Sequence, residues 1–325
     1  MRVAIASRAT ARASVGMRVY ARALLERLPR VAPDLALIPV DAPVVTLPLA
    51  LRAARAELVH LPYLEAPPLL PHPYTAMVHD LLHLRFPEQF SALTAAYWRL
   101  VAIPLYRGAT RVLVSDPRVA DDCVAMLGVR RERLRVVPLG YSDAVPNAEP
   151  WEAQRPYLFY AGNHKQHKGL ETLYAAWHAL GDVPLDLVLT GRDEPAVRAR
   201  YVRSGGTITF LGEIDDATLA RRYRGALAYV QPSLAEGFGI PALEAAVAGT
   251  PVIATTTSVP AVVAPYAATF APGDASTLAS LLRAIVSDPR RSRERAAEGA
   301  VVLRAYTWDR FAAETAAVFR EVVCS

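Results

Sequence analysis

Short apolar runs alternate with longer amphipathic stretches along the first half of the chain. β-branched and apolar residues dominate the runs, which are typical of strands, and the longer stretches have the spacing of helices that bury one face. Strands are predicted at 1–7, 57–62, 74–80, 111–116 and 133–140, and helices at 17–28 and 118–127. This βα alternation predicts a parallel, doubly wound sheet.

The pattern breaks once and then restarts. Residues 141–156 contain three prolines and show no periodicity, so they are predicted to form a linker. After it, strands are predicted at 157–162, 185–191, 207–212, 226–233 and 250–255, and helices at 170–180, 217–226 and 242–249. The fold class predicted is therefore α/β, with two Rossmann-like domains facing a cleft. Ligands of such sheets bind at the carboxyl ends of the strands.

Composition excludes several classes of protein. The 325 residues are 53% hydrophobic and 21% charged, which argues against disorder. Residues 1–150 hold 18 arginines and 13 acidic residues, whereas the remainder is balanced, so the net charge of +5 lies in the first half. Because the arginines are scattered and form no basic tail, nucleic acid is not expected as a partner. A solvated arginine surface and peripheral contact with an anionic membrane both stay open.

Metal and cofactor sites find no support in the sequence. The two cysteines are 201 positions apart, and the spacing of histidines 60, 72, 79 and 83 fits no zinc pattern. No pair of carboxylates forms a DxD motif, so no metal and no cofactor are expected. Neither a signal peptide nor an apolar span of about 18 residues is found. We expect a cytoplasmic protein, with contact at the inner face of a membrane left open.

The loop at 161–173 (AGNHKQHKGLETL) holds Lys165 and Lys168, which are the only lysines of the chain. Glycines bound this loop, a predicted strand precedes it and a predicted helix follows it. The first amides of a helix are free to donate and its amino end carries partial positive charge, which suits phosphate. A lysine adds a mobile point charge. The loop is either a phosphate cradle or an exposed basic loop.

A second loop, at 231–249 (QPSLAEGFGIPALEAAVAG), carries two carboxylates. Glu236 lies in a turn with two glycines and Phe238, and Glu244 lies a little way into the following helix. Carboxylates there can accept hydrogen bonds from sugar or ribose hydroxyls. Glu244 alone could also be a simple partner of the helix dipole.

The segment EGFGIPALEA resembles the E-x7-E signature of the family 4 glycosyltransferases, which are retaining enzymes of the GT-B fold. GNHKQHKGLETLYAAW is similar to the diphosphate loop of that family, and MVHDLLHLRFPEQF resembles the His-Asp segment of its mannosyltransferase-like members. Further segments follow in the usual family order over nearly the whole chain. Ser258 to Ala261 depart from a pattern that commonly ends in Glu, and no function is drawn from them.

The resemblance implies roles for individual residues. Lys168 would pair with the donor diphosphate, Glu236 would hold the donor sugar or its phosphate, and Glu244 would bind the ribose. His79 would lie near the reacting end of the sugar, with Asp80 orienting its ring. Asn163 stands where the family often has arginine, so Lys165, His164 or the backbone amides of Gly237 to Gly239 would meet part of the diphosphate charge. The remaining donor-binding residues implied are Gly16, Gly191, Gly212, Ile214, Gly237, Phe238, Gly239, Ile240 and Leu243.

The same resemblance implies domains and a reaction. Residues 1–148 would form the acceptor-side domain, 149–308 the donor-binding domain, and a helix at about 309–325 would cross back to the first. A metal-independent hexosyltransferase is expected, moving a sugar with retention to a glycan, glycolipid or natural product. GDP-mannose is favoured as donor, with UDP- or dTDP-sugars next. The alternatives are a non-catalytic nucleotide-sugar-binding subunit, a GT-B epimerase and, last, a Rossmann oxidoreductase, which lacks its GxGxxG motif here.

Overall fold

The computed structural model describes residues 1–6, 15–63, 69–191 and 195–324, which form two units. Unit 1 is Met1–Gly140 together with Tyr306–Ser325, and unit 2 is Tyr141–Ala305. Each unit has one six-stranded sheet, and every strand pairing in both sheets is parallel. The prediction of two Rossmann-like α/β units is confirmed.

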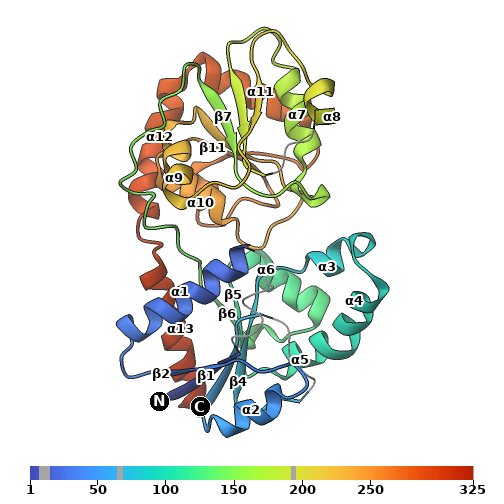
Figure 1. The fold of residues 1–325 in the computed structure, drawn as a ribbon, viewed down its shortest axis with the longest axis vertical. Coiled ribbons are helices and arrows are strands. Elements are labelled where there is room, and N and C mark those ends of the chain that lie inside the picture. The colour runs from blue at the N-terminus through green and yellow to red at the C-terminus, as the bar shows by residue number, and fades with distance from the viewer. Residues whose placement is uncertain (7–14, 64–68, 192–194, 325) are drawn as a thin grey trace. The chain divides into compact units, whose positions relative to one another are not determined.

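Unit 1 has the strand order β2-β1-β3-β4-β5-β6. In Figure 1, α1 and α13 cover one face of its sheet, whereas α5 and α6 lie on the other. Both chain ends lie in this unit. Its strands are β1 (Arg2–Ala6), β2 (Ala36–Val40), β3 (Leu58–Leu61), β4 (Tyr74–Val78), β5 (Arg111–Val114) and β6 (Leu134–Val136). Its helices are α1 (Val15–Val31), α2 (Leu47–Ala53), α3 (Leu82–Arg85), α4 (Ala92–Tyr97), α5 (Ile103–Gly108), α6 (Pro117–Asp122) and α13 (Trp308–Val323).

Unit 2 has the strand order β12-β11-β10-β7-β8-β9. Helices α9, α10 and α12 cover one face of this sheet, and α7, α8 and α11 the other (Figure 1). Its strands are β7 (Tyr157–Tyr160), β8 (Asp186–Leu189), β9 (Ile208–Phe210), β10 (Ala228–Gln231), β11 (Val252–Thr255) and β12 (Ala268–Phe270). Its helices are α7 (Leu170–His178), α8 (Pro195–Arg200), α9 (Asp216–Gly225), α10 (Ile240–Val247), α11 (Ala275–Ser287) and α12 (Pro289–Leu303).

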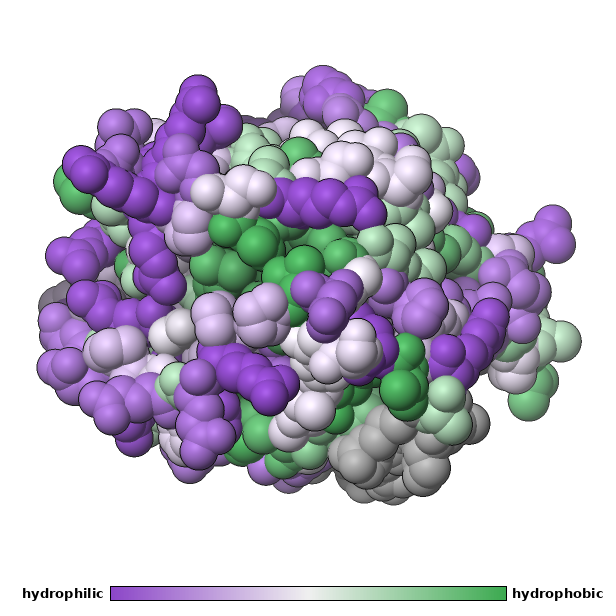
Figure 2. Space-filling view, turned by 90° about the horizontal axis from the view of Figure 1, so that it is seen from above, coloured by the Kyte–Doolittle hydropathy of each residue, from purple (hydrophilic) through white to green (hydrophobic). Residues whose placement is uncertain are grey.

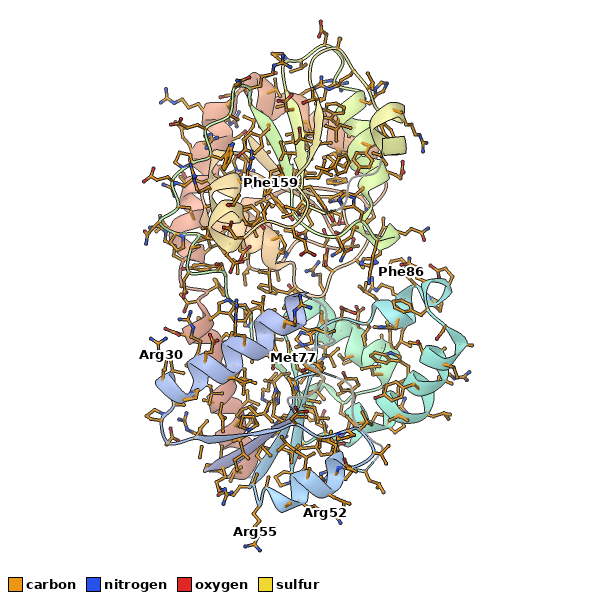
Figure 3. The ribbon with its side chains drawn as sticks, viewed as in Figure 1. Arg30, Arg52, Arg55, Met77, Phe86 and Phe159 are labelled. Atoms are coloured by element: carbon orange, nitrogen blue, oxygen red, sulfur yellow. The ribbon has the colours of Figure 1, made fainter. Side chains whose placement is uncertain are left out.

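Helices on both faces explain the apolar runs in the sequence. All four residues of β7, β10 and β11 are buried, because a strand covered on both faces has no solvent-facing side. Met77 and Phe159 lie inside their units, whereas Arg30, Arg52 and Arg55 point outward (Figure 3). On the face drawn in Figure 2, hydrophilic residues surround a smaller hydrophobic area.

The predicted linker is ordered against unit 2. Residues 141–156 contain no helix or strand, in agreement with their prolines. The Trp151 amide donates to the Arg221 carbonyl oxygen at 2.9 Å, and the Arg222 guanidinium lies 3.6 Å from the centre of the Trp151 ring. The segment that includes the predicted boundary at 148 and 149 is thus attached to α9.

Helix α13 belongs to unit 1, although it follows unit 2 in the chain. Its Asp309 accepts a hydrogen bond from Arg27 of α1 at 3.2 Å, and its Arg320 donates to Asp34 at 2.6 Å. Glu321 pairs with Arg111 and Arg135 of β5 and β6. The end of the chain therefore helps to close the hydrophobic core of unit 1.

Candidate functional site

The two loops selected from the sequence follow neighbouring strands. β7 lies between β8 and β10, so the chain leaves β7 toward one side of the sheet and leaves β10 toward the other. Such a reversal of direction opens a crevice at the carboxyl ends of the strands, where α/β proteins bind ligands. The loop after β7 carries Lys168, and the loop after β10 carries Glu236.

Backbone contacts join these loops directly. The Leu234 amide donates to the carbonyl oxygen of His167 at 2.8 Å. Gly169 has a φ of +63°, and a Cβ at this position would lie 2.2 Å from the carbonyl oxygen of Pro232. A glycine is required there for both reasons, since L side chains rarely adopt this conformation. The 3₁₀ turn Gln166–Lys168 is therefore held against the turn after β10.

Lys168 and Glu236 form an ion pair across the two loops. The distance from Lys168 Nζ to Glu236 Oε1 is 2.6 Å, and the side chains are only 16% and 15% exposed. An ammonium group has three donors, so two remain for a ligand. Lys165, by contrast, is exposed, and its amide donates to Asn163 Oδ1 at 3.2 Å.

Backbone amides supply further donors beside this pair. Among the residues that the structure describes, the amides of Gly237, Phe238, Gly239 and Ile240 have no hydrogen-bond partner, and they lead into the amino end of α10. The ring of Phe238 and the side chain of Leu243 are buried in unit 2, at 4% and 0% exposure. Phe238 can contact a ligand only through its backbone, whereas the Leu243 amide already donates to the Gly239 carbonyl oxygen and its side chain packs in the core of unit 2.

Glu244 is a buried carboxyl group, with 7% exposure. Burial raises its pKa to about 7, against the effects of a hydrogen bond from the Ser142 amide and of the nearby Tyr223 hydroxyl. The Ser142 amide lies 3.0 Å from Oε1. An acid with this pKa changes its charge close to neutral pH, which a simple partner of the helix dipole on the surface does not do.

The ends of β8 and β9 complete this edge of the sheet. The Gly191 amide donates to the Gly212 carbonyl oxygen at 3.0 Å, so these two glycines link the neighbouring loops. His164 Nε2 lies 2.7 Å from the carbonyl oxygen of Thr190. Ile214, two residues after Gly212, is half-buried.

Gly16, His79 and Asp80 belong to unit 1. His79 follows β4, and its Nε2 is hydrogen-bonded to the carbonyl oxygen of Pro62 at 2.8 Å. Asp80 Oδ1 accepts from the Leu82 amide, and the hydrogen bond of the His79 ring that the structure shows is the one to Pro62. Burial lowers the pKa of His79, which favours a neutral imidazole. Gly16 is exposed in the first turn of α1, and among the described residues no atom lies within 4 Å of a Cβ built on it.

Sequence reasoning missed the polar residues beneath the loops. Ser233 and Thr255 are fully buried and support the turn that carries Glu236. Thr190 accepts a hydrogen bond from the Gly162 amide at 2.8 Å. The one available signal was position, because Ser233 and Thr255 each lie at or just beyond the carboxyl end of a predicted strand.

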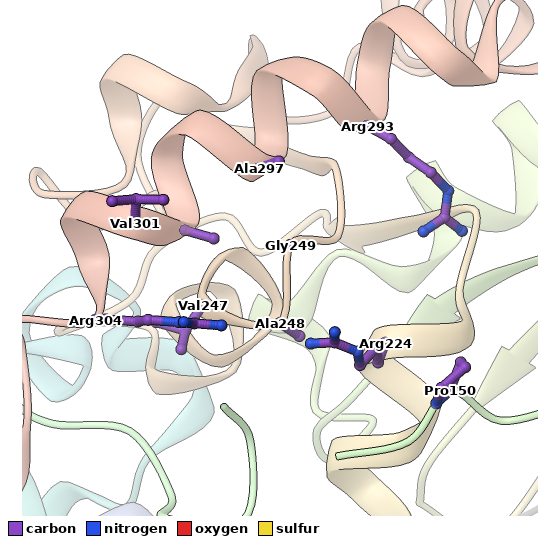
Figure 4. A pocket seen from close by; sticks show the side chains of 10 residues that line it. Pro150, Arg224, Val247, Ala248, Gly249, Arg293, Ala297, Val301 and Arg304 are labelled. Carbon is purple, nitrogen blue, oxygen red and sulfur yellow. The ribbon is translucent and has the colours of Figure 1, made fainter. Parts of the chain in front are cut away.

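A separate basic pocket of about 490 Å³ lies elsewhere in unit 2 and contains none of the predicted site residues (Figure 4). Its three arginines lie at the carboxyl ends of helices or donate hydrogen bonds to them. Arg224 lies in the last turn of α9, Arg304 caps α12, and Arg293 donates to the Ala226 carbonyl oxygen. Cations are favourable at the carboxyl ends of helices, so local structure explains all three. The pocket is lined by Pro150, Arg224, Val247, Ala248, Gly249, Arg293, Ala297, Ala300, Val301 and Arg304.

Neither a metal cluster nor a membrane span is found in the part of the chain that the structure describes. No three His, Cys, Asp or Glu side chains there gather in a way that could hold a metal ion. No described helix is long and apolar enough to cross a bilayer.

Relatives of known name resemble this chain. Residues 142–301 match the family model described as Glycosyl transferases group 1. The O-antigen chain mannosyltransferase RfbU of Salmonella typhimurium is 26% identical over 185 residues, 55% of this chain and 51% of that protein. The MMP alpha-(1->4)-mannosyltransferase of Mycolicibacterium hassiacum is 28% identical over 228 residues, 67% of this chain and 55% of that protein. The chain thus spans about half the length of these relatives.

Solved structures extend the likeness to the whole chain. The sucrose-phosphate synthase of Thermosynechococcus elongatus superposes with a TM-score of 0.77 at 22% identity, covering 99% of both chains. The two six-stranded parallel sheets, together with this likeness over the whole chain, define an α/β protein of the GT-B fold. Residues 142–301, about half of the chain, belong to the group 1 glycosyltransferases, the family that the E-x7-E segment predicted.

Proposed function

We propose that this protein is a retaining glycosyltransferase that moves a sugar from a nucleotide-diphosphate sugar to an acceptor hydroxyl. The observation that carries the proposal is the Lys168–Glu236 pair at the carboxyl ends of β7 and β10, with free amides from Gly237 to Ile240 beside it. A cation and several amides on one edge of a sheet fit a diphosphate. Membership of the group 1 family supports the same reading.

The proposed chemistry breaks the bond between the anomeric carbon and the diphosphate oxygen. A new bond forms from that carbon to the acceptor oxygen on the same face of the sugar, and the acceptor proton passes to the departing diphosphate. Lys168 and the amides of residues 237–240 would stabilise the negative charge that develops on the leaving group. Such preorganised donors are effective because they need no rearrangement during the reaction.

The remaining predicted residues have supporting roles in this proposal. Glu244 would accept hydrogen bonds from the ribose, and the segment with Gly191, Gly212 and Ile214 would flank the base. His79 would act near the anomeric carbon from unit 1, as a neutral imidazole that contributes a hydrogen bond and no charge. These roles come from the family resemblance, and the places of these residues at the ends of strands support them.

GDP-mannose is the donor we propose first. Two relatives are named mannosyltransferases, and the VHDLLHLRFPE segment resembles that part of the family. UDP- and dTDP-sugars are the next candidates. The acceptor is a glycan, a glycolipid or a small natural product. A lipid-linked acceptor would suit the basic first half of the chain, which could then contact an anionic membrane surface.

A thermal-shift screen with GDP, UDP, dTDP and ADP, and with their sugars, tests the proposal in the presence of EDTA. Ligand at 100 times its Kd stabilises the folded state by about 2.7 kcal/mol, so one base should raise the melting temperature clearly. No shift with any nucleotide would contradict the proposal. Conversion of a bound nucleotide sugar into its epimer, with no acceptor added, would instead identify an epimerase.

A further inference from the structure

Ser233 lies directly beneath the ion pair of the proposed site. Its side chain is fully buried, and its hydroxyl donates to Glu236 Oε1 at 2.7 Å. The same oxygen accepts from Lys168 Nζ at 2.6 Å. Glu236 is therefore held by two donors on one oxygen, and the direction of its carboxylate is fixed by the hydroxyl from below and by the ammonium from the neighbouring loop.

A set of buried polar groups holds Ser233 in turn. The Thr255 hydroxyl donates to the carbonyl oxygen of Ser233 at 2.6 Å and lies 2.7 Å from Ser258 Oγ. Gln231 Nε2 donates to the carbonyl oxygen of Ser258 at 2.8 Å. These side chains are at most 2% exposed. Buried networks whose members are all hydrogen-bonded are rigid, so β10 and β11 jointly set the place of the Ser233 hydroxyl.

We propose that Ser233 is a positioning residue of the donor site, which fixes Glu236 and through it the direction of the Lys168 ammonium. The inference rests on the proposed function, because it assigns the ammonium to the diphosphate. Ser233 does not touch the donor. Its hydroxyl keeps the carboxylate in place when the diphosphate approaches the two donors of Lys168 that Glu236 leaves free.

The position of Ser233 also limits what Glu236 can do. Oε1 already accepts two hydrogen bonds, whereas no hydrogen bond to Oε2 is found among the described residues. The free oxygen can accept from a hydroxyl of the donor sugar. In this proposal, the anchored carboxylate holds Lys168 through Oε1 and leaves Oε2 for a hydroxyl of the donor sugar.

The test compares affinities for a nucleoside diphosphate and for the matching nucleoside monophosphate, measured by calorimetry. Because Ser233 acts through Lys168 on the diphosphate, Ser233→Ala should weaken diphosphate binding about three- to tenfold, the loss expected from one hydrogen bond. Binding of the monophosphate should change less than twofold. Ser233→Cys keeps the shape with a weaker donor, so it should show an intermediate loss.

Thr250→Val is the matched control. Thr250 also carries a buried hydroxyl in unit 2. It lies just before the amino end of β11, whereas the two loops lie at the carboxyl ends of their strands, and it donates to the carbonyl oxygen of Tyr223 in α9. Its loss should lower thermal stability without changing the ratio of the two affinities. If Ser233→Ala is too unstable to titrate, Ser233→Cys gives the same comparison.

A double-mutant cycle separates positioning from general damage. In the Lys168→Ala background, Ser233→Ala should cause no further change in the ratio of the affinities. Equal weakening of both nucleotides, or an unchanged ratio in Ser233→Ala and Ser233→Cys, would overturn the inference and leave the proposed function standing. Failure of the wild-type protein to bind any nucleoside diphosphate would overturn the proposed function and, with it, this inference.

Discussion

Single residues of unit 2 set the charge of the site at neutral pH. Lys168 is paired with Glu236, whereas Glu244 is buried and has a pKa raised to about 7. A carboxyl group of this kind is partly neutral in the free protein, because burial penalises its charged form. It accepts hydrogen bonds from two hydroxyls best when it is ionised.

Nucleoside diphosphate binding should therefore depend on the charge of Glu244. We expect affinity to fall as the pH drops below about 7, by at most about tenfold per pH unit, because the ligand must compete with a proton. Calorimetry from pH 5.5 to 8.5 measures this dependence. Glu244→Gln is the control, and the titration of the nucleotide's own phosphate is common to both proteins. Identical pH profiles would contradict the ribose assignment.

The same raised pKa has a consequence for stability. The folded state binds a proton more tightly than the unfolded state, so Glu244 stabilises the fold below about pH 4.5. This contribution is lost as the pH rises through about 7. Urea unfolding of the ligand-free protein measures the unfolding free energies of the wild type and of Glu244→Gln. Between about pH 4.5 and 7, that of the wild type should fall relative to that of the variant as the pH rises. A difference that stays constant would show that the pKa is not raised.

The sequence pattern predicted the charged residues of the candidate site better than the buried polar residues that hydrogen-bond to them. Lys168 and Glu236 stood out because lysine is rare in this chain and because glycines flank the glutamate. Ser233 did not, since a serine just after a strand is an ordinary loop residue. The partner of His79 was missed for a simpler reason. It is the backbone carbonyl of Pro62, and a carbonyl group leaves no signal in the sequence.

At the scale of elements, the loops after β7 and β10 behave as one structure. Gly169 makes this contact possible, because its Cα faces the carbonyl oxygen of Pro232. Any side chain there must push the two loops apart. The spacing of Lys168 and Glu236 thus depends on a glycine that belongs to neither side of the ion pair.

Gly169→Ala should destabilise unit 2 by more than about 2 kcal/mol, from backbone strain and from the clash with Pro232. Gly181→Ala is the matched control, because Gly181 has a φ of +70° but open space around it. That variant should acquire only the backbone strain, which should lower its unfolding free energy by about 1 kcal/mol. Chemical denaturation gives both values, and diphosphate affinity should fall in the first variant only. Equal losses in the two variants would contradict the close contact.

Helix α13 is attached to the sheet of unit 1 by charge as well as by packing. Arg135 first, and then Arg111, lower the pKa of Glu321 to about 2. The contribution of this carboxylate is present above about pH 4.5, its range in the unfolded chain, and is lost as the pH falls toward 2.

Glu321→Gln should lower the stability of unit 1 at pH 7 by about 1 kcal/mol, a modest value because the side chain is 34% exposed. Denaturation at a series of pH values should show the gap from the wild type closing below about pH 4.5. Glu314→Gln, in the same helix, removes an exposed pair with Arg310 and should cost less. A gap that persists at pH 2.5 would exclude the ion pairs as its cause.

Among the strands, those that escaped prediction are β2 and β12, the end strands of one edge in each sheet. β2 contains Pro39, which breaks the pattern of a strand, and β12 has only three residues. Proline is tolerated at edges, where one side of the strand needs no partner. The central strands were predicted because burial on both faces makes them continuously apolar.

At the scale of the whole chain, two α/β units share one polypeptide and differ in their charge and in their match to the family model. Unit 2 carries the paired loops and the residues matched by the family model. The excess positive charge lies in residues 1–150, nearly all of which belong to unit 1. This division agrees with a donor site in unit 2. The sequence did not predict the acceptor, because no motif that we recognise in unit 1 specifies the chemistry of an acceptor.

The central claim is that the edge formed by the loops after β7 and β10 binds a diphosphate. Calorimetric titration of the wild type and of Lys168→Ala with the preferred nucleoside diphosphate, in EDTA, tests it most directly. We predict one site per chain and at least about tenfold weaker binding in the variant, since a charged hydrogen bond is worth about 1.5–3 kcal/mol. Its melting temperature should change little. Equal affinity in the two proteins would contradict the claim.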